Sequence, residues 1–375
     1  MSKPTLHLFT FFACNSFFGG GAIVRDVLKE MKGRFDLKWH YLDEFDETND
    51  TEQWVRQHVA CEPIHILRKR RFLYTLLDHY YYFRGMPALA RSFAKHLPPG
   101  DVVWIILDNK MIPFAHELCR INIKNKIHVS VHDDSRNYYK RYKRISSTTN
   151  DYFKRIFSRV DSSDFIGKHM LEEYQKEFGA RGIVFRRGVE AEKIQVKVPR
   201  QKDTYSLLFA GSSHSNACWV RLVRKLSAFS AEFEILVLGN PAFTQGFEAE
   251  LSQAGNIRLK KGGTVPDNEI AQHAAHCDLA VFFFDDLAED RLRFSVSTKL
   301  ALYGRLGLPM IGYISSLSEL KELERRKLAF SLERSEAEFR NWINDFSGEE
   351  YKSYFRENFD GKKMMEDLKA CVAFT

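Results

Sequence analysis

Hydrophobic and polar residues alternate along this chain in two distinct ways. Short runs are almost continuously apolar, such as TLHLFTFF at 5–12 and DVVWIILD at 101–108, which is typical of strands buried on both faces. Longer segments carry apolar residues at helical spacing, such as GGGAIVRDVLKEM at 19–31. Because the two kinds of segment follow one another in turn, the pattern predicts a parallel sheet covered by helices on both faces.

The alternation begins a second time after a polar stretch with one proline, VKVPRQKDT at 196–204, which has the composition of an interdomain linker. A chain of 375 residues also exceeds what one hydrophobic core ordinarily holds. We therefore predict two doubly wound α/β domains, at 1–195 and 204–350. The helical tail at about 352–375 is predicted to pack back on the first domain.

Composition narrows the class of protein. Hydrophobic residues make up 44% of the chain and charged residues 28%, a balance typical of a soluble globular protein. No apolar run approaches the roughly 18 residues of a membrane-crossing helix. The apolar run near the N-terminus leads into a glycine-rich segment, so we interpret it as a buried strand and not as a signal peptide. The six cysteines have no metal or disulfide spacing. The expected location is therefore a reducing cytoplasm, and no metal is expected.

The net charge of +7 favours anionic partners. Two stretches, 66–85 and 136–159, mix basic with aromatic residues. Such stretches suit contact with an anionic membrane surface, and they equally suit helices whose aromatic face lies in the core. For a chain of this length, the net charge is too small to favour nucleic-acid binding.

Ligands of doubly wound sheets bind at the carboxyl ends of the strands, so residues that follow strands are the candidates. In the first domain, the first such residues are Gly19, Gly20 and Gly21, between the first strand and its helix. Glycines let the backbone approach a ligand, and the free N–H groups of a helix start favour an anion or a sugar hydroxyl. The alternative is an ordinary tight turn.

The buried strand KIHVSV is followed directly by His132, Asp133 and Asp134. A histidine and carboxylates at this place suit a general base, a clamp on a sugar, or a set of metal ligands. The alternative is an exposed turn in which Asp134 caps a helix.

In the second domain, Gly211, Ser212 and Ser213 leave the first strand and lead into a helix, which suits a phosphate or simple capping. A later buried strand ends at Asp285 and Asp286.

The segment RFSVSTKLALYGRLGLPMIGY at 293–313 places Ser297, Thr298 and Lys299 at the start of a helix. Hydroxyls, free N–H groups and an ammonium together form a diphosphate site that needs no metal. The alternative is an ordinary helix cap with a surface lysine.

Taken in order, these segments resemble the GT-B glycosyltransferases over nearly the full length. In the first half the resemblance lies in GGGAIVRDVLKEM, VSVHDD and DSSDFIGKHMLEEYQKEFGARGIVFRRGV. In the second half it lies in LLFAGS, FEILVLGN, NIRLKKGGTVPDNEIAQHAAHCDLAVFFF and STKLALYGRLGLPMI, the last being similar to the signature PsKl.EYlaaGkPvv. The resemblance implies two Rossmann-like domains that face a central cleft. The donor would bind the second domain and the acceptor the first, with closure about the linker.

The sequence departs from that family at one position. Many retaining members carry a Glu seven residues before the proline of the signature, and it holds the nucleotide ribose. Counting back from Pro309, this position is Leu302, and an earlier acidic partner would fall at Phe294. The family resemblance therefore leaves the ribose contact to Asp285 or Asp286.

The version SVSTKL is similar to that of the xanthan-type glucuronosyltransferases. By that resemblance Lys299 binds the diphosphate and Asp133 or Asp134 is the base, which implies inversion. If His132 instead contacts the donor sugar, as in retaining members, retention is implied.

The resemblance implies a metal-independent sugar transferase without a cofactor. It would move a hexosyl or related sugar from a nucleotide-diphosphate donor to a glycan or lipid-linked acceptor, in surface polysaccharide or glycoconjugate biosynthesis at the inner face of the plasma membrane. Two alternatives remain: a nucleotide-sugar epimerase of the same fold, and a catalytically silent binding or scaffold protein, which the leucine at position 302 favours.

Overall fold

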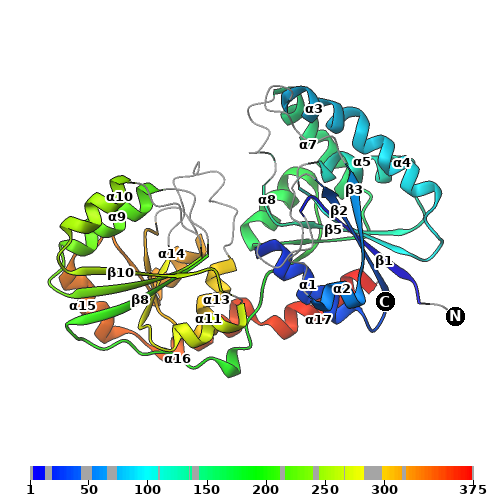
Figure 1. The fold of residues 1–375 in the computed structure, drawn as a ribbon. Coiled ribbons are helices and arrows are strands. Elements are labelled where there is room, and N and C mark those ends of the chain that lie inside the picture. The colour runs from blue at the N-terminus through cyan, green and yellow to red at the C-terminus, as the bar shows by residue number, and fades with distance from the viewer. Residues whose placement is uncertain are drawn as a thin grey trace. The chain divides into compact units, whose positions relative to one another are not determined.

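The computed structural model describes most of the chain in two compact units (Figure 1). The first unit is Met1–Arg186 together with Lys363–Thr375, and the second is Arg187–Lys362. The described residues are 3–12, 19–43, 53–65, 74–108, 110–134, 136, 143–211, 216–239, 245–265, 267–282, 298–314 and 318–373.

The first unit is built on a seven-stranded parallel sheet with the strand order β3-β2-β1-β4-β5-β6-β7. Its strands are β1 (Thr5–Thr10), β2 (Asp36–Asp43), β3 (Ala60–His65), β4 (Val102–Ile106), β5 (Lys126–Val131), β6 (Ser162–Phe165) and β7 (Ile183–Val184). Its helices are α1 (Gly19–Met31), α2 (Gln53–His58), α3 (Tyr74–Tyr80), the π-helix η1 (Tyr81–Gly85), α4 (Met86–Lys95), α5 (Met111–Ile121), α7 (Lys143–Phe157) and α8 (Lys168–Phe178).

The second unit repeats the plan with a six-stranded parallel sheet in the order β10-β9-β8-β11-β12-β13. Its strands are β8 (Thr204–Ala210), β9 (Glu232–Leu238), β10 (Ile257–Gly263), β11 (Leu279–Phe282), β12 (Met310–Gly312) and β13 (Ala329–Ser331). Its helical segments are η2 (Ala191–Lys193), α9 (Asn216–Ser227), α10 (Gln245–Gln253), α11 (Asp267–Ala274), α13 (Thr298–Leu306), α14 (Ser318–Arg325), α15 (Glu336–Asp345) and α16 (Gly348–Phe359). The predicted fold class, two doubly wound Rossmann-like domains, is confirmed.

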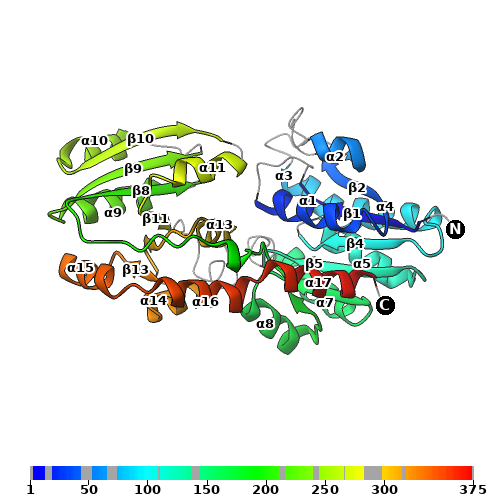
Figure 2. The same cartoon turned by 90° about the horizontal axis from the view of Figure 1, so that it is seen from below.

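The last helix, α17 (Gly361–Ala373), completes the core of the first unit. Figures 1 and 2 show it beside α1, on one face of the sheet. Its Met364, Leu368 and Val372 are buried in one cluster with apolar residues of α1, β1, β2 and β4. The Ser162 hydroxyl donates to the Cys371 carbonyl at 3.1 Å, which fixes the end of α17 to β6. A C-terminal helix therefore packs on the first unit, as predicted.

The unit boundaries differ from the predicted linker and tail. The first unit ends at Arg186, so the polar stretch 196–204 lies inside the second unit. There the Lys197 ammonium donates to the carbonyls of Ala274, Ala275 and Cys277 at 2.6, 2.6 and 2.9 Å, at the end of α11. One lysine thus uses all three donors to cap a helix, which composition alone does not reveal.

The tail predicted as one helix from about 352 is two helices, of which α16 belongs to the second unit. No helix in the described parts of the chain is long and apolar enough to cross a membrane.

A row of hydrogen-bonded polar side chains runs across the first sheet. The His7 imidazole lies between Asp101 and His40, with Nε2 3.1 Å from Asp101 Oδ2 and Nδ1 3.1 Å from His40 Nε2. His40 Nδ1 is in turn 3.0 Å from Glu62 Oε2. Burial lowers the pKa of His7, and burial followed by the neighbouring His7 and Lys38 lowers the pKa of His40 to about 3. Burial therefore favours the neutral form of both rings in the folded protein.

This arrangement predicts that acid destabilises the fold through His40. The unfolded imidazole, with a pKa near 6.5, takes up a proton as the pH falls, and the folded one does not until about pH 3. Stability is thus complete above pH 6.5 and decreases below it by up to about 1.4 kcal/mol per pH unit. In His40→Gln, the loss of stability between pH 7.5 and 5, measured by urea unfolding, should be about 2 kcal/mol smaller than in the wild type.

The exposed His96 supplies the control, since His96→Gln should keep the wild-type dependence on pH. Equal slopes in all three proteins would contradict the assignment to His40.

Candidate functional site

The carboxyl edge of the second sheet has a topological switch point between β8 and β11. These strands are neighbours in the sheet, but β8 is followed along the chain by β9 on one side and β11 by β12 on the other. The helices that follow two such strands diverge to opposite faces and leave a crevice at the carboxyl ends, where doubly wound folds bind ligands. Gly211, just after β8, and the start of α13 both lie at this edge.

Two glycines let the backbone of this edge pack closely. Gly211 has φ +117° and Gly239, which follows β9, has φ +129°, conformations that other residues rarely adopt. A Cβ at Gly239 would lie only 2.2 Å from the Gly211 carbonyl oxygen. Gly211 was a predicted site residue and Gly239 was missed, although a glycine directly after the apolar run EILVL was a usable signal.

Lys299 lies against Gly211, so two residues predicted for the same site meet although they are far apart in sequence. A Cβ on Gly211 would be 2.8 Å from Lys299 Cε and 3.7 Å from Nζ. The ammonium also lies 5.0 Å from the centroid of the Phe209 ring, within cation–π range. Because Thr298 begins α13, the positive end of the helix dipole and the ammonium are at the same place, an arrangement that binds anions.

Tyr303 holds α13 in that position. One turn after Lys299, its buried hydroxyl accepts a hydrogen bond from the Ala210 N–H at 3.0 Å. Burial raises the pKa of Tyr303, so the hydroxyl is neutral. The Tyr351 hydroxyl of α16 lies 3.1 Å from the Tyr303 carbonyl and 2.9 Å from the Leu308 carbonyl, which fixes the C-terminal end of α13. These tyrosines were not predicted from the sequence, because hydrogen bonds between distant segments leave no periodic pattern.

Leu302, the position at which the sequence departs from the retaining family members, is buried in α13 with 7% of its surface exposed. An ionised carboxylate at a position so buried would be costly unless it were paired. Leucine therefore fits this position as a packing residue.

The predictions for five further residues of the second domain lie outside the described residues. They are Ser212, Ser213, Asp285, Asp286 and Ser297. Phe294 lies outside them as well.

At the carboxyl edge of the first sheet, the two adjacent carboxylates after β5 have different surroundings. Asp134 is buried and forms an ion pair with Arg136, whose Nε and Nη2 donate to its two oxygens at 2.7 and 2.9 Å. The Tyr174 hydroxyl adds a bond of 3.2 Å to Oδ1. Asp134 thus stabilises the turn, while His132 and Asp133 are only partly buried.

His132 continues a line of polar side chains on β5. Earlier along β5, His128 Nε2 lies 2.7 Å from Asp164 Oδ2, and the Ser130 hydroxyl donates to the same oxygen. Within the described residues, the buried Oδ1 of Asp164 has no hydrogen-bond partner. Burial lowers the pKa of His132, against the opposing effect of Asp164 and Asp133, so its imidazole is neutral at pH 7 and able to accept a proton. The alternation in HVSVH signals this line, which the sequence analysis missed.

The three glycines at 19–21 lie in the first turn of α1 and not in a turn before it. Because α1 follows β1, its free N–H groups still belong to the carboxyl edge of the first sheet. Among the residues that the structure describes, no cluster of three or more His, Cys, Asp or Glu side chains could hold a metal ion.

Solved structures of low sequence identity share this architecture. No protein-family model and no curated protein matches the sequence. The lipopolysaccharide outer core galactosyltransferase WaaB superposes with a TM-score of 0.68 at 12% identity, covering 99% of each chain. HepE from Anabaena, in complex with UDP and glucose, gives 0.63 at 12% identity over 99% of this chain and 100% of that one. An α,α-trehalose-phosphate synthase (UDP-forming) from Burkholderia vietnamiensis gives 0.62 at 13% identity over 100% of both.

These neighbours are GT-B glycosyltransferases, and the match extends over both units. The chain therefore has the GT-B fold.

The close approach at Gly239 predicts a strong effect of a single methyl group. Gly239→Ala requires a positive φ and moves the Gly211 carbonyl, so we expect it to lower the free energy of unfolding by more than about 2 kcal/mol. Gly255→Ala, where no heavy atom lies within 4 Å of the added Cβ, should change it by less than about 0.5 kcal/mol. Urea unfolding of both variants measures the difference, and similar losses would contradict the packing described.

The buried hydroxyl of Tyr303 gives a second prediction. Tyr303→Phe leaves the Ala210 N–H without a partner, which should cost about 1–3 kcal/mol of unfolding free energy. Tyr313 donates to the Arg221 carbonyl at 2.8 Å at a more exposed place, so Tyr313→Phe should cost well under about 1 kcal/mol. If thermal and urea unfolding show the two variants to be equally stable, Tyr303 does not anchor α13.

Proposed function

We propose that this protein is a glycosyltransferase that moves a hexosyl or related sugar from a nucleotide-diphosphate donor to a glycan or lipid-linked acceptor. The observation that carries the proposal is the contact of Lys299 with Gly211 at the switch point of the second sheet. When the bond between the sugar and the diphosphate breaks, negative charge develops on the leaving phosphate. An ammonium and a helix N-terminus held in place beforehand stabilise that charge.

The ligands of the similar structures support a nucleotide-sugar donor. HepE was solved with UDP and glucose, and an enzyme from E. coli with UDP-2-fluoro glucose, the latter at a TM-score of 0.58 and 11% identity. A uridine diphosphate sugar is accordingly the first donor to test. No metal or cofactor is part of the proposed reaction, since Lys299 supplies the positive charge at the diphosphate.

On the first unit, His132 and Asp133 are the proposed partners of the acceptor, because Asp134 is already paired with Arg136. In the inverting reaction, Asp133 removes the proton from the acceptor hydroxyl, whose oxygen then attacks the anomeric carbon as the nucleoside diphosphate leaves. Asp133 as base corresponds to inversion, and His132 as a contact to the donor sugar corresponds to retention. The anomeric configuration of the product distinguishes them.

The proposed setting is the synthesis of a surface polysaccharide or glycoconjugate at the cytoplasmic face of the plasma membrane. The similarity to a lipopolysaccharide galactosyltransferase and the net charge of +7 support it. Peripheral contact with anionic lipids is part of this proposal.

A screen for donor binding tests the proposal. Thermal unfolding is measured with UDP-, GDP-, CMP- and dTDP-sugars, one of which should raise the melting temperature of the wild type. Lys299→Met should weaken that binding about tenfold or more, since a hydrogen bond to a charged group contributes about 1.5–3 kcal/mol.

The matched control is Lys225→Met. Lys225 also lies over an aromatic ring, 5.9 Å from the centroid of Phe229, but at the C-terminal end of α9, away from the carboxyl edge. It should bind the donor as the wild type does. The donor site is wrong if no nucleotide sugar stabilises the wild type, or if Lys299→Met binds as tightly as Lys225→Met.

Analysis of the products formed from the bound donor separates the alternatives. Conversion of the bound sugar nucleotide to another sugar nucleotide, without an acceptor and without hydrolysis, would identify an epimerase. Donor binding with no turnover of any kind would identify a silent binding protein, the alternative for which Leu302 is the motivating observation.

A further inference from the structure

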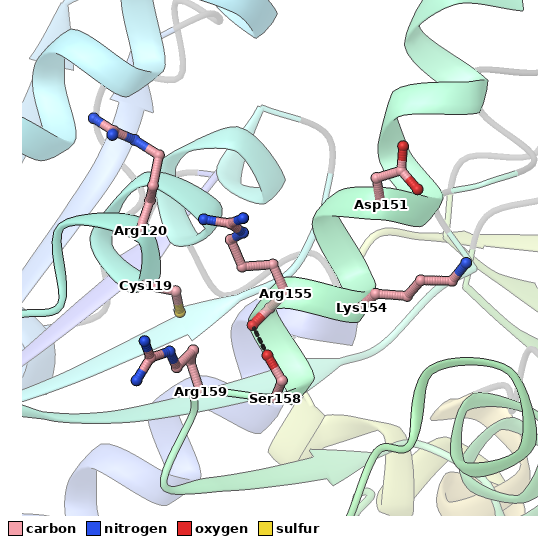
Figure 3. Close-up of a pocket in the computed structure, with 7 residues that line it drawn as sticks. All are labelled: Cys119, Arg120, Asp151, Lys154, Arg155, Ser158 and Arg159. Atoms are coloured by element: carbon pink, nitrogen blue, oxygen red, sulfur yellow. Dashed lines mark hydrogen bonds between the residues drawn. The ribbon is translucent and has the colours of Figure 1, made fainter.

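We propose that a basic pocket on the first unit is a second ligand site, which binds a phosphate-bearing anion. The pocket has a volume of about 460 Å³ and lies between the C-terminal ends of α5 and α7 (Figure 3). Its size is that of a small-molecule site. Two residues of α5 and five residues on or just after α7 line it: Cys119, Arg120, Asp151, Lys154, Arg155, Ser158 and Arg159.

The pocket concentrates positive charge at the C-terminal end of α7. Lys154, Arg155 and Arg159 lie at spacings of one, four and five residues, and Arg120 adds a fourth cation against the single carboxylate of Asp151. Within the described residues, no ion pair is formed by Lys154, Arg155 or Arg159. Cations four residues apart repel one another on a helix, and a bound anion would relieve this repulsion.

Hydrogen bonds to Glu117 hold the Arg120 guanidinium in position. Glu117, which is buried, accepts from Arg120 Nε at 2.7 Å and from Nη2 at 2.9 Å. The Arg91 guanidinium lies 2.5 Å from the same carboxylate. The hydrogen bonds of Arg120, and then those of Arg91, lower the pKa of Glu117 to about 2, so the carboxylate is charged at all ordinary pH values. One end of the Arg120 guanidinium, Nη1, takes no part in these bonds.

Apart from Asp151, the residues that line the pocket carry no competing negative charge. Burial raises the pKa of Cys119 to about 12, so its thiol is neutral. Figure 3 shows Arg155 and Arg159 extending from the α7 side toward α5, with the Cys119 sulfur between them. The Ser158 hydroxyl donates to the Arg155 carbonyl at 2.8 Å. Two guanidinium groups beside a neutral floor match the geometry of a phosphate or diphosphate group.

The place of the pocket in the fold separates it from the proposed catalytic residues. α5 ends at Ile121, shortly before β5 begins, and α7 ends at Phe157, shortly before β6 begins. The pocket is therefore at the amino edge of the first sheet, opposite the edge where His132 and Asp133 follow β5. Cations at helix C-termini also stabilise the helix dipoles, which explains why the side chains here are positively charged. It does not explain why side chains from two helices line the same pocket.

Calorimetric titration with inorganic pyrophosphate tests the proposal. The wild type should bind, and Arg155→Ala with Arg159→Ala should weaken binding at least tenfold. The control pair Lys32→Ala with Arg34→Ala removes the same charge from exposed positions just after the C-terminal end of α1, at the same edge of the sheet but outside the pocket, and should bind as the wild type does. Unfolding temperatures of both double variants verify that they remain folded.

Pyrophosphate would also bind the proposed donor site, so the titration is repeated in Lys299→Met. In Lys299→Met, the pyrophosphate binding that depends on Arg155 and Arg159 should persist. The proposal is overturned if the wild type does not bind, if both double variants weaken binding equally, or if Lys299→Met alone abolishes it. This outcome is independent of whether a nucleotide sugar binds the second unit.

Vesicles distinguish the two sources of such a phosphate. If vesicles with phosphatidylglycerol bind the protein through Arg155 and Arg159, and pyrophosphate displaces them, the ligand is a lipid headgroup. If pyrophosphate binds and vesicles do not, it is a soluble phosphorylated compound. The proposed site is contradicted if vesicles bind equally well without these two arginines and pyrophosphate does not bind.

Discussion

The hydrogen bond from the Ala210 N–H to the Tyr303 hydroxyl determines the geometry of the second unit's candidate site. It joins the end of β8 to the middle of α13, and so it fixes where the first turn of that helix begins. Lys299 lies in that turn, and its ammonium reaches Gly211 only because α13 is held there. The buried Tyr351 completes the support from α16. A partly buried cation is thereby given a fixed position by two neutral, buried hydroxyls.

The fold was largely predictable from the sequence because strands that are buried on both faces must be continuously apolar. Segments such as VVWII and LAVF show this directly. The positions of Gly211 and Lys299 at strand and helix ends were also predictable. Their contact was not, since it depends on the order in which the strands lie in the sheet. Tyr303 and Asp164 were missed because they act through contacts with distant segments, which no local pattern records. Gly239 was missed although a glycine directly after an apolar run was a usable signal.

Adjacent residues of one type can have different roles, and Asp133 and Asp134 show why the sequence could not separate them. Arg136, two residues further along, donates hydrogen bonds to both oxygens of Asp134, and Tyr174 of α8 donates another. The polar stretch 196–204 shows a related limit of composition. Lys197 lies in a stretch that is polar enough for a linker, but its ammonium caps α11 with three hydrogen bonds.

The helix α17 has a consequence for how the protein is made. Residues 187–362 form the second unit from one continuous segment, whereas the first unit needs residues from both sides of it. On a ribosome, the first sheet emerges long before α17, so the apolar surface around Trp39 and Trp104 has no cover from that helix until the whole second unit has been made. The second unit can close earlier, although it starts later. A nascent chain of this protein thus has an extended period in which chaperones can bind its N-terminal half.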